Sequence, residues 1–506
     1  MEHFPLLTFI TFAPLAGMLL VALMPKEKLN WIRWSALLGT LPSLVGAVIL
    51  FLDFDRTTKA IQLAEGPYKW IEAFNIHYYF GVDGLSVTMV ILTALISTIC
   101  IIASWKITKQ VKAYFVLFLL LETGMMGTFL ALDFFLFFIF WEVMLLPMYF
   151  LIGIWGGARR EYAAIKFFLY TMAGSVLMLL VMIAFYLYAG TFNMIELQNQ
   201  AIHLGPLSGE HFRLLCWLGL FIGFAIKVPV FPFHTWLPDA HVEAPTAISV
   251  ILAGVLLKMG TYGILRFNYQ IFPDITVDMA YWMALLGVIN IIYGALCAMA
   301  QKDFKKLIAY SSVSHMGFVI LGIASFTSEG INGGVLQMFN HGTITAQLFL
   351  LVGVIYDRAH HREINGFGGM ASIMPKYAVW TTIAFFAAVG LPGLSGFISE
   401  ALIFLGSFKT YQGLTAIAVT SVVFTAAYML WTLQRVYLGK ENEKYKAFPD
   451  ISRREALCLL PLAAIVLILG VYPKPALDMM RVSLDGINEV LLKHGDRVAT
   501  MLQSIP

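Results

Sequence analysis

The chain has 506 residues, of which 59% are hydrophobic and only 12% are charged, and its mean hydropathy is +0.80. A water-soluble globular domain carries about 25% charged residues, so this composition excludes that class and predicts a polytopic membrane protein. The formal net charge of +3 excludes no partner by itself, because the sign of charge in a membrane protein matters loop by loop.

Apolar runs long enough to cross a bilayer as helices recur along the whole chain. We predict an all-α polytopic fold with about 14 transmembrane helices, which begin near residues 5, 31, 83, 113, 134, 164, 212, 245, 276, 306, 331, 377, 413 and 455. The first 20 residues lack a basic leader and a small-residue cleavage pattern, so we expect a retained span there and no signal peptide. A long extramembrane connection is expected over residues 53–82.

Lysine and arginine residues gather on one side of this predicted topology. The loops on that side hold 21 of them, the opposite loops hold six, and the C-terminal tail holds four. Because cytoplasmic loops carry the excess of positive charge, the bias predicts that both termini lie on the non-cytoplasmic side.

Two acidic residues fall within the fourth and fifth predicted spans, Glu122 in LLLETGMMG and Glu142 in LFFIFWEVMLLPMYFLIGIWG. The neighbours of Glu142 are almost all aromatic or aliphatic, so an ionised carboxylate there needs a nearby cation. Lys227 is the cation that we expect, and we predict a functional role for Glu142. For Glu122, a functional role and a structural contact between helices both stay open.

The segment from Cys216 to Gly263 places Lys227 and Lys258 inside long apolar stretches. An ammonium group at membrane depth costs about 2.5 to 3.5 kcal/mol, so two such lysines indicate a function. Four prolines lie between them: Pro229, Pro232, Pro238 and Pro245. A proline within a helix leaves the carbonyl four residues earlier without its partner, so a broken helix with free carbonyls at Ala225 and Val228 is expected beside Lys227.

The turn HTWLPDAH carries His234, Asp239 and His241, which in principle could hold a metal ion. Two prolines, Pro232 just before the turn and Pro238 within it, and a tryptophan stiffen this segment, and no further ligands lie nearby in the sequence. We therefore expect a capping and hydrogen-bonding turn. The four cysteines are scattered singly, without metal, haem or redox spacing, and are expected to be core residues.

The second half of the chain places His315 and His341 within apolar spans, and histidine relays protons near neutral pH. A hydrogen-bonded packing role is the alternative for each histidine. The stretch AVGLPGLSGFISEALIFL then breaks a second helix and puts Glu400 in its continuation. Broken helices carrying a buried charge thus occur in the seventh and twelfth spans, and this spacing predicts two inverted five-helix repeats.

We accordingly divide the chain into four parts. Residues 1–112 hold the first three transmembrane helices, 113–268 the first repeat (helices 4–8), 276–438 the second, inverted repeat (helices 9–13), and 439–506 the last transmembrane helix and an amphipathic tail. The tail repeats apolar residues near helical spacing and should dock on a neighbour or lie at the membrane interface. These residues are Ile487, Val490, Leu491, Val498 and Leu502.

Several motifs together resemble the antiporter-like membrane-arm subunits of respiratory complex I, the proton-translocating NADH:quinone oxidoreductase. They are LFFIFWEVMLLPMYFLIGIWGG, FAIKVPVFPFHTWLPDAHVEAPTAISVILAGVLLKMG, DFKKLIAYSSVSHMG, NHG and LPGLSGFISE. The resemblance covers roughly residues 80–440. His315 in SSVSHMG favours the chain M type over the chain L type and over Mrp-type antiporter subunits, where a glutamine is expected.

The resemblance implies roles for matching residues. Glu142 would pair with Lys227, Lys258 would be the central relay, His315 and His341 would extend the path, and Glu400 would gate proton exchange in the second half. It also implies that this chain holds no cofactor or metal, and that NADH, FMN, Fe–S clusters and quinone belong to partner subunits, with L-type and N-type chains as neighbours. The expected location is a bacterial cytoplasmic membrane.

Two other function classes are alternatives to this expectation. An Mrp-type cation/proton antiporter subunit, or a membrane subunit of a hydrogenase-linked pump, shares most of the motifs, and copurifying partners would discriminate between these and complex I. A purely structural scaffold does not explain half a dozen costly buried charges. The sequence contains no haem, flavin, Fe–S or nicotinamide motif, which excludes a stand-alone redox enzyme.

Overall fold

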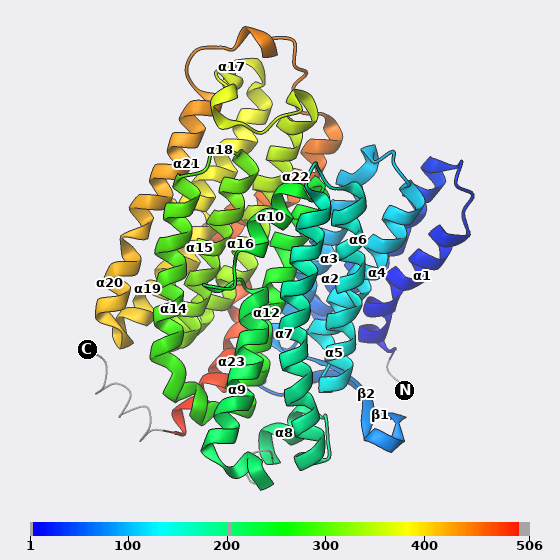
Figure 1. Ribbon diagram of the computed structural model, residues 1–506, viewed down its shortest axis with the longest axis vertical. Coiled ribbons are helices and arrows are strands. Elements are labelled where there is room, and N and C mark those ends of the chain that lie inside the picture. Colours follow the sequence, from blue (N-terminus) through cyan, green and yellow to red (C-terminus); the bar gives the residue numbers. More distant parts are fainter. Residues whose placement is uncertain (1–3, 201–204, 495–506) are drawn as a thin grey trace.

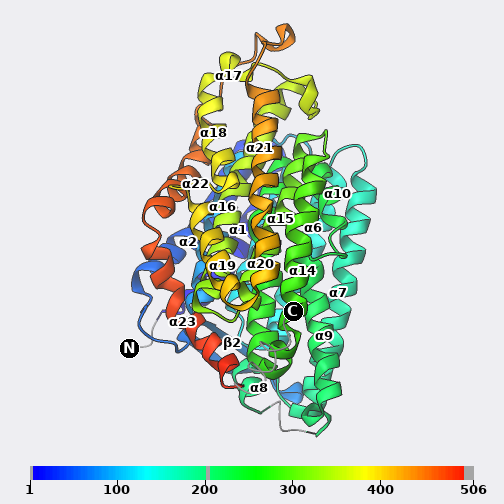
Figure 2. The same ribbon diagram turned by 90° about the vertical axis from the view of Figure 1, so that its left-hand side faces the viewer.

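The computed structural model describes residues 4–200 and 205–494 as a bundle of helices that run along its long axis (Figures 1 and 2). Twelve helical segments of the described chain are long and apolar enough to cross a membrane. They are α1 (Leu6–Leu23), α2 (Leu29–Asp53), α3 (Gly84–Ala103), α4 (Val111–Leu130), α5 with α6 (Phe134–Val143, Leu145–Trp155), α7 (Arg160–Ala189), α11 to α13 (Thr246–Ile271), α14 (Pro273–Met299), α15 (Phe304–Ala324), α16 (Ser328–Ala359), α20 with α21 (Gln412–Val419, Ser421–Tyr437) and α22 (Arg453–Val471).

Two further elements are interrupted, at the places of the predicted seventh and twelfth spans. The first consists of α9 (Glu210–Lys227) and α10 (Trp236–Glu243), and the second of α18 (Pro375–Val389) and α19 (Ser395–Thr410). Both breaks expected from the prolines and glycines are therefore confirmed. With the twelve continuous segments, they account for every span predicted from the sequence.

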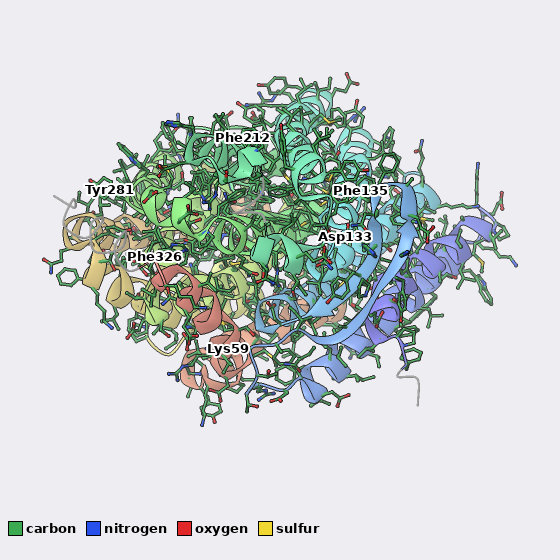
Figure 3. The ribbon with its side chains drawn as sticks, turned by 90° about the horizontal axis from the view of Figure 1, so that it is seen from below. Lys59, Asp133, Phe135, Phe212, Tyr281 and Phe326 are labelled. Carbon is green, nitrogen blue, oxygen red and sulfur yellow. The ribbon has the colours of Figure 1, made fainter. Side chains whose placement is uncertain are left out.

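A two-stranded antiparallel hairpin is the exception to the all-helical class. Strands β1 (Gln62–Ile71) and β2 (Ile76–Val82) lie within the predicted connection, which was not expected to form strands. The backbone N–H of His77 donates to Oδ2 of Asp133 at 3.1 Å, which ties β2 to the start of α5. The hairpin and the short α8 (Met194–Gln200) lie at one end of the molecule, and α17 (Met370–Ile373) lies at the other (Figures 1 and 3).

The C-terminal helix α23 (Lys474–Leu492) packs against its own chain. Its buried face includes Met480, Leu484 and Leu491, and the Oγ of Ser483 accepts the backbone N–H of Gly84 at 2.9 Å. The predicted tail thus forms a helix with a buried face over Lys474–Leu492, but it packs on its own chain, and docking on a neighbour or at the membrane interface stays a prediction. Val498 and Leu502, the last two residues of that predicted pattern, lie outside the described part of the chain.

Helices α14 and α15 approach closely because glycines lie where they cross. A Cβ added at Gly317 would lie 2.6 Å from the carbonyl oxygen of Gly287 and 2.8 Å from the backbone nitrogen of Ile291. Backbone atoms cannot rotate away from such a clash as side-chain ends can. This contact holds the helix that carries His315 in place.

Replacing Gly317 with valine should therefore destabilise the protein by about 1 to 3 kcal/mol, the usual cost of overpacking. We expect a smaller yield of folded protein and a lower thermal midpoint. Gly413→Val is the matched control, because a Cβ at that helical position meets nothing within 4 Å. Equal stability of the two variants would contradict the assigned role of the close approach.

Candidate functional site

Lys258 lies at the centre of the bundle on a helix with an irregular hydrogen-bond ladder. Its turn, α12 (Leu257–Gly263), lies between two π-helical segments, η5 (Leu252–Leu256) and η6 (Ile264–Asn268). The N–H of Leu257 bonds to the carbonyl of Leu252, five residues earlier. Such π-bulges occur frequently at functional sites, and here the carbonyl of Ala253 accepts a hydrogen bond from the Nζ of Lys258.

A line of ionisable groups starts at this lysine, whose side chain is fully buried. The Nζ of Lys258 lies 2.7 Å from Nδ1 of His341 on α16. The ring centroid of His341 is 5.9 Å from that of His315 on α15, and Nδ1 of His315 is 3.2 Å from Oε1 of Glu400 on α19. Four of the six candidate residues are therefore brought together from four different helices.

The two histidines have ring nitrogens free for a further exchange of protons. The Nε2 atoms of His315 and His341 are buried and have no hydrogen-bond partner. Both residues and Glu400 line a small cavity of about 10 Å³. This volume is close to the roughly 10 to 15 Å³ that a cavity needs in order to hold one water molecule.

Glu400 faces the break between α18 and α19. Gly390 and Gly393 have φ values of +80° and +93° in this break, a backbone region that favours glycine. A Cβ at Gly390 would lie 2.9 Å from Oε2 of Glu400. The broken helix thus leaves room for the carboxylate, as its glycines predict.

Sequence reasoning missed a polar cluster next to Glu400. The Oγ of Ser399 donates to Oε1 of Gln337 at 2.5 Å, and Nδ2 of Asn340 donates to the same Oγ at 3.1 Å. Gln337 and His341 are four residues apart in QMFNHG, so they share a face of α16. That spacing is the signal from which the cluster could have been found.

Lys227 ends α9 and is 1% exposed. Its Nζ lies 5.3 Å from the ring centroid of Trp141 and 5.5 Å from that of Phe167, both within the range of cation–π attraction. The expected free carbonyl at Ala225 is not present, because the N–H of Val230 donates to it at 2.8 Å. The irregular turn after Pro229 supplies this donor.

Glu142 and Lys227 are not in contact in this structure. Glu142 lies on α5, half-buried, and its Oε1 is buried without a hydrogen-bond partner. No ion pair within 4.0 Å joins it to Lys227, and no hydrogen bond joins Lys227 to Lys258, in the described chain. Glu142 and Lys227 thus stand apart from the line that runs from Lys258 to Glu400, and their pairing stays a prediction.

Two other residues considered in the sequence, Glu122 and Asp239, make hydrogen bonds in the structure. Oε1 of Glu122 accepts a hydrogen bond from Thr40 at 2.6 Å, which is a contact between helices, while its Oε2 is buried without a partner. In the HTWLPDAH turn, Asp239 binds Lys166 at 2.7 Å.

The turn is hydrogen-bonded, as expected, through the contact of Asp239 with Lys166, but the rings of its two histidines take no part in this bonding. All four ring nitrogens of His234 and His241 are buried without hydrogen-bond partners. Both rings lie against aromatic side chains, and the ring centroid of His241 is 4.6 Å from that of Phe349. The expected capping is also not observed, since α10 has no side-chain cap. Among the described residues, no group of three or more His, Cys, Asp or Glu side chains could hold a metal ion.

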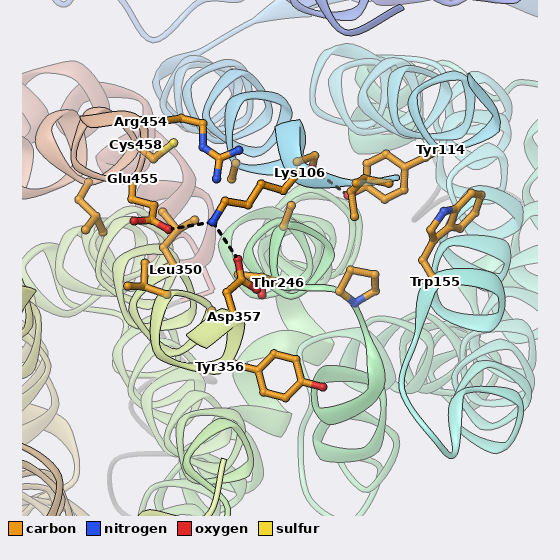
Figure 4. Close-up of a pocket in the computed structure, with 18 residues that line it drawn as sticks. Lys106, Tyr114, Trp155, Thr246, Leu350, Tyr356, Asp357, Arg454, Glu455 and Cys458 are labelled. Atoms are coloured by element: carbon orange, nitrogen blue, oxygen red, sulfur yellow. Dashed lines mark hydrogen bonds and ion pairs between the residues drawn. The ribbon is translucent and has the colours of Figure 1, made fainter. Parts of the chain in front are cut away.

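A larger cavity of about 280 Å³ lies beside the loops rich in lysine and arginine (Figure 4). Lys106 crosses it, with its Nζ 3.7 Å from Asp357 and 3.5 Å from Glu455. Thr246, which begins the helix of Lys258, also lines it, but none of the six candidate residues does. The cavity is therefore separate from the line of buried charges.

Two interrupted helices, two buried lysines and a line of histidines that ends at a carboxylate together define an antiporter-like, ion-translocating membrane protein. Residues 131–425 match the family described as NADH:quinone oxidoreductase/Mrp antiporter, and residues 9–133 match NADH-ubiquinone oxidoreductase chain 4, amino terminus. NADH-quinone oxidoreductase subunit M of Rhodobacter capsulatus is 44% identical over 94% of each chain. The chain belongs to the subunit M, or chain 4, family of antiporter-like membrane subunits of respiratory complex I.

Solved structures agree with this assignment. A chain of respiratory complex I from Thermus thermophilus is 30% identical, with a TM-score of 0.87 over 96% of this chain and 99% of that one. A chain of the Mrp complex from Dietzia has a TM-score of 0.84 over 97% and 99% of the two chains, but at 22% identity this shows only a shared fold. The Mrp complex is thus the more distant structural neighbour.

Proposed function

We propose that this chain carries protons through Glu142, Lys227, Lys258, His341, His315 and Glu400, coupled to electron transfer from NADH to quinone in partner subunits. The observation that carries the proposal is the contact series from Lys258 through the two histidines to Glu400. Ionisable groups buried in a membrane span are costly, and such series mark proton relays.

The two direct contacts in the line each allow one proton transfer, and the gap between the two histidines needs a bridging water. The ammonium of Lys258 donates to Nδ1 of His341, so a proton that moves along this hydrogen bond leaves a neutral amine and a charged imidazole. A water in the small cavity would bridge the two histidines, since their rings do not meet directly. His315 then delivers the proton to Glu400 through the 3.2 Å contact.

The first step depends on the distance between Glu142 and Lys227. When the carboxylate approaches, it stabilises the ammonium form of Lys227, and when it withdraws, the lysine releases its proton more easily. Each pKa unit corresponds to about 1.36 kcal/mol. The separated arrangement of the two side chains would be the proton-releasing one.

The remaining assignments extend this proposal. NADH, FMN, Fe–S clusters and quinone act in partner subunits, and L-type and N-type antiporter-like chains are the neighbours. The chain lies in a bacterial cytoplasmic membrane, and the 21-to-6 distribution of basic residues supports an orientation with both termini on the non-cytoplasmic side. Residues 113–268 and 276–438 form the two inverted repeats, each with one interrupted helix.

The test is NADH-driven proton pumping by membranes that carry His341→Gln. Glutamine keeps polarity but cannot relay a proton, so we expect pumping to fall by about tenfold or more. His211→Gln is the matched control, because His211 is exposed at the start of α9. Unchanged pumping by His341→Gln in an assembled complex would overturn the relay through the histidines.

A further inference from the structure

Gln337 lines the same small cavity as His315, His341 and Glu400. It lies on α16 four residues before His341, so the two side chains share a face of the helix. The residue is 2% exposed, and the cavity of about 10 Å³ has room for about one water molecule. The proposed relay assigns no proton step to this glutamine.

Three hydrogen bonds determine which end of the Gln337 amide carries the nitrogen. The carbonyl oxygen of Ser395 only accepts, so the end of the Asn340 side chain that lies 2.8 Å from it is the donor Nδ2. This Nδ2 also donates to Oγ of Ser399 at 3.1 Å. The Ser399 hydroxyl in turn donates to Gln337 at 2.5 Å, a distance within the range for an O–H donor and below that for an N–H donor. The oxygen of Gln337 is thus occupied, and its NH₂ group is the end left for the cavity.

This network is closed to solvent and joins two helices of the relay. Asn340, Ser395 and Ser399 are all 0% exposed. Ser399 directly precedes Glu400 in α19, whereas Gln337 and Asn340 belong to the helix of His341. Hydrogen bonds in such a dry environment are strong, so the amide of Gln337 is held in one orientation.

An amide NH₂ group donates hydrogen bonds and accepts none. A water in the cavity that accepts one hydrogen bond from Gln337 keeps one lone pair and both of its hydrogens. It can therefore accept the Nε2–H of His341 and donate to Nε2 of His315, two atoms that are buried without a hydrogen-bond partner in the protein. The amide itself does not titrate near neutral pH, so it takes no proton from the line.

We propose that Gln337 is a positioning residue that holds a water molecule between His341 and His315, with one lone pair of that water free for the incoming proton. The inference rests on the proposed function and deepens it, because it names the group that orients the bridging water. A proton that reaches Nδ1 of His341 from Lys258 releases the Nε2 proton to this water, and the water passes one of its own hydrogens to Nε2 of His315.

The first test is NADH-driven proton pumping, per assembled complex, by membranes that carry Gln337→Met. Methionine is of similar size but donates no hydrogen bond, so we expect pumping to fall by at least about threefold, as for the loss of one hydrogen bond. Gln347→Met is the matched control. Gln347 is also fully buried on α16, but it does not line the cavity, and both of its polar atoms have no hydrogen-bond partner. We expect pumping by this control at the parent level.

The second test is the pH profile of Gln337→Glu, which separates a donor from a group that only fills space. At low pH the new carboxyl group is protonated and its O–H donates as the amide does, whereas at high pH it is ionised and only accepts. We therefore expect the ratio of variant to parent pumping to be highest at acidic pH and to fall as the pH rises. The titratable groups that line the cavity with position 337 are His315, His341 and Glu400, and the parent has the same three.

Three results would overturn the proposal. They are pumping by Gln337→Met at the level of its control, an equal loss in both methionine variants, and a ratio for Gln337→Glu that does not change with pH. If Gln337→Met does not assemble, Ser399→Ala is read in its place, because the amide is no longer held in one orientation without that hydroxyl. Parent-level pumping by Ser399→Ala would then overturn the proposal.

Failure of this inference and failure of the proposed function are distinguishable. Unchanged pumping by His341→Gln would remove the relay itself. Reduced pumping by His341→Gln together with parent-level pumping by Gln337→Met would keep the relay and remove only the role of Gln337.

Discussion

Replacing Lys258 with methionine should strongly reduce coupled turnover: we expect both NADH-driven quinone reduction and proton pumping to fall by about tenfold or more. Methionine has a side chain of similar volume, but it carries no proton to donate and cannot form the hydrogen bond to His341. Removal of a buried ammonium relieves a cost of about 2.5 to 3.5 kcal/mol at membrane depth, so the complex should still assemble.

The measurement is the rate of quinone reduction in membranes whose assembled complex is quantified on native gels. Lys409→Met is the matched control, because Lys409 is exposed on the Glu400 helix and pairs at the surface with Glu329. A Lys258→Met complex with the activity of this control would show that Lys258 is not part of the relay.

Glu142→Gln should have the second largest effect. The change keeps the size of the side chain and removes the charge that would approach Lys227, so the lysine loses the partner that modulates its proton affinity. We expect sharply reduced NADH oxidation and pumping, again by about tenfold. Because Oε1 of Glu142 has no hydrogen-bond partner here, a structural loss should be small.

The control for this variant is Glu161→Gln, an exposed glutamate at the start of α7. NADH oxidation and pumping at the level of this control would remove Glu142 from the mechanism. If the parent membranes showed no NADH-linked activity at all, the antiporter alternative would have to be reconsidered.

The transmembrane part of the fold could be predicted from the sequence because its causes are local. Apolar runs of the right length specify spans, and the prolines after Lys227 and the glycines before Glu400 specify breaks. The hairpin was missed because it lies in a polar connection where β1 is largely exposed and irregular in register. Such a strand has no alternating apolar pattern to indicate it.

The candidate residues could be found as costly charges in apolar segments, but their mutual geometry could not. The 2.7 Å contact of Lys258 with His341 depends on how α12 and α16 pack, and the π-helical turns depend on a shift of hydrogen bonds that no local pattern specified. The same holds for the buried ion pair of Arg266 with Asp83, which joins residues 183 positions apart in the chain. Asp83 also caps α3, because its Oδ1 accepts the backbone N–H of Ser86.

The most direct test of the central claim is the number of protons pumped per NADH oxidised by the purified complex carrying Lys258→Met, reconstituted in liposomes. If protons pass along Lys258, His341, His315 and Glu400, the remaining turnover should pump fewer protons per NADH than the parent complex. A ratio equal to that of the parent would mean that the buried line in this chain carries no protons during turnover.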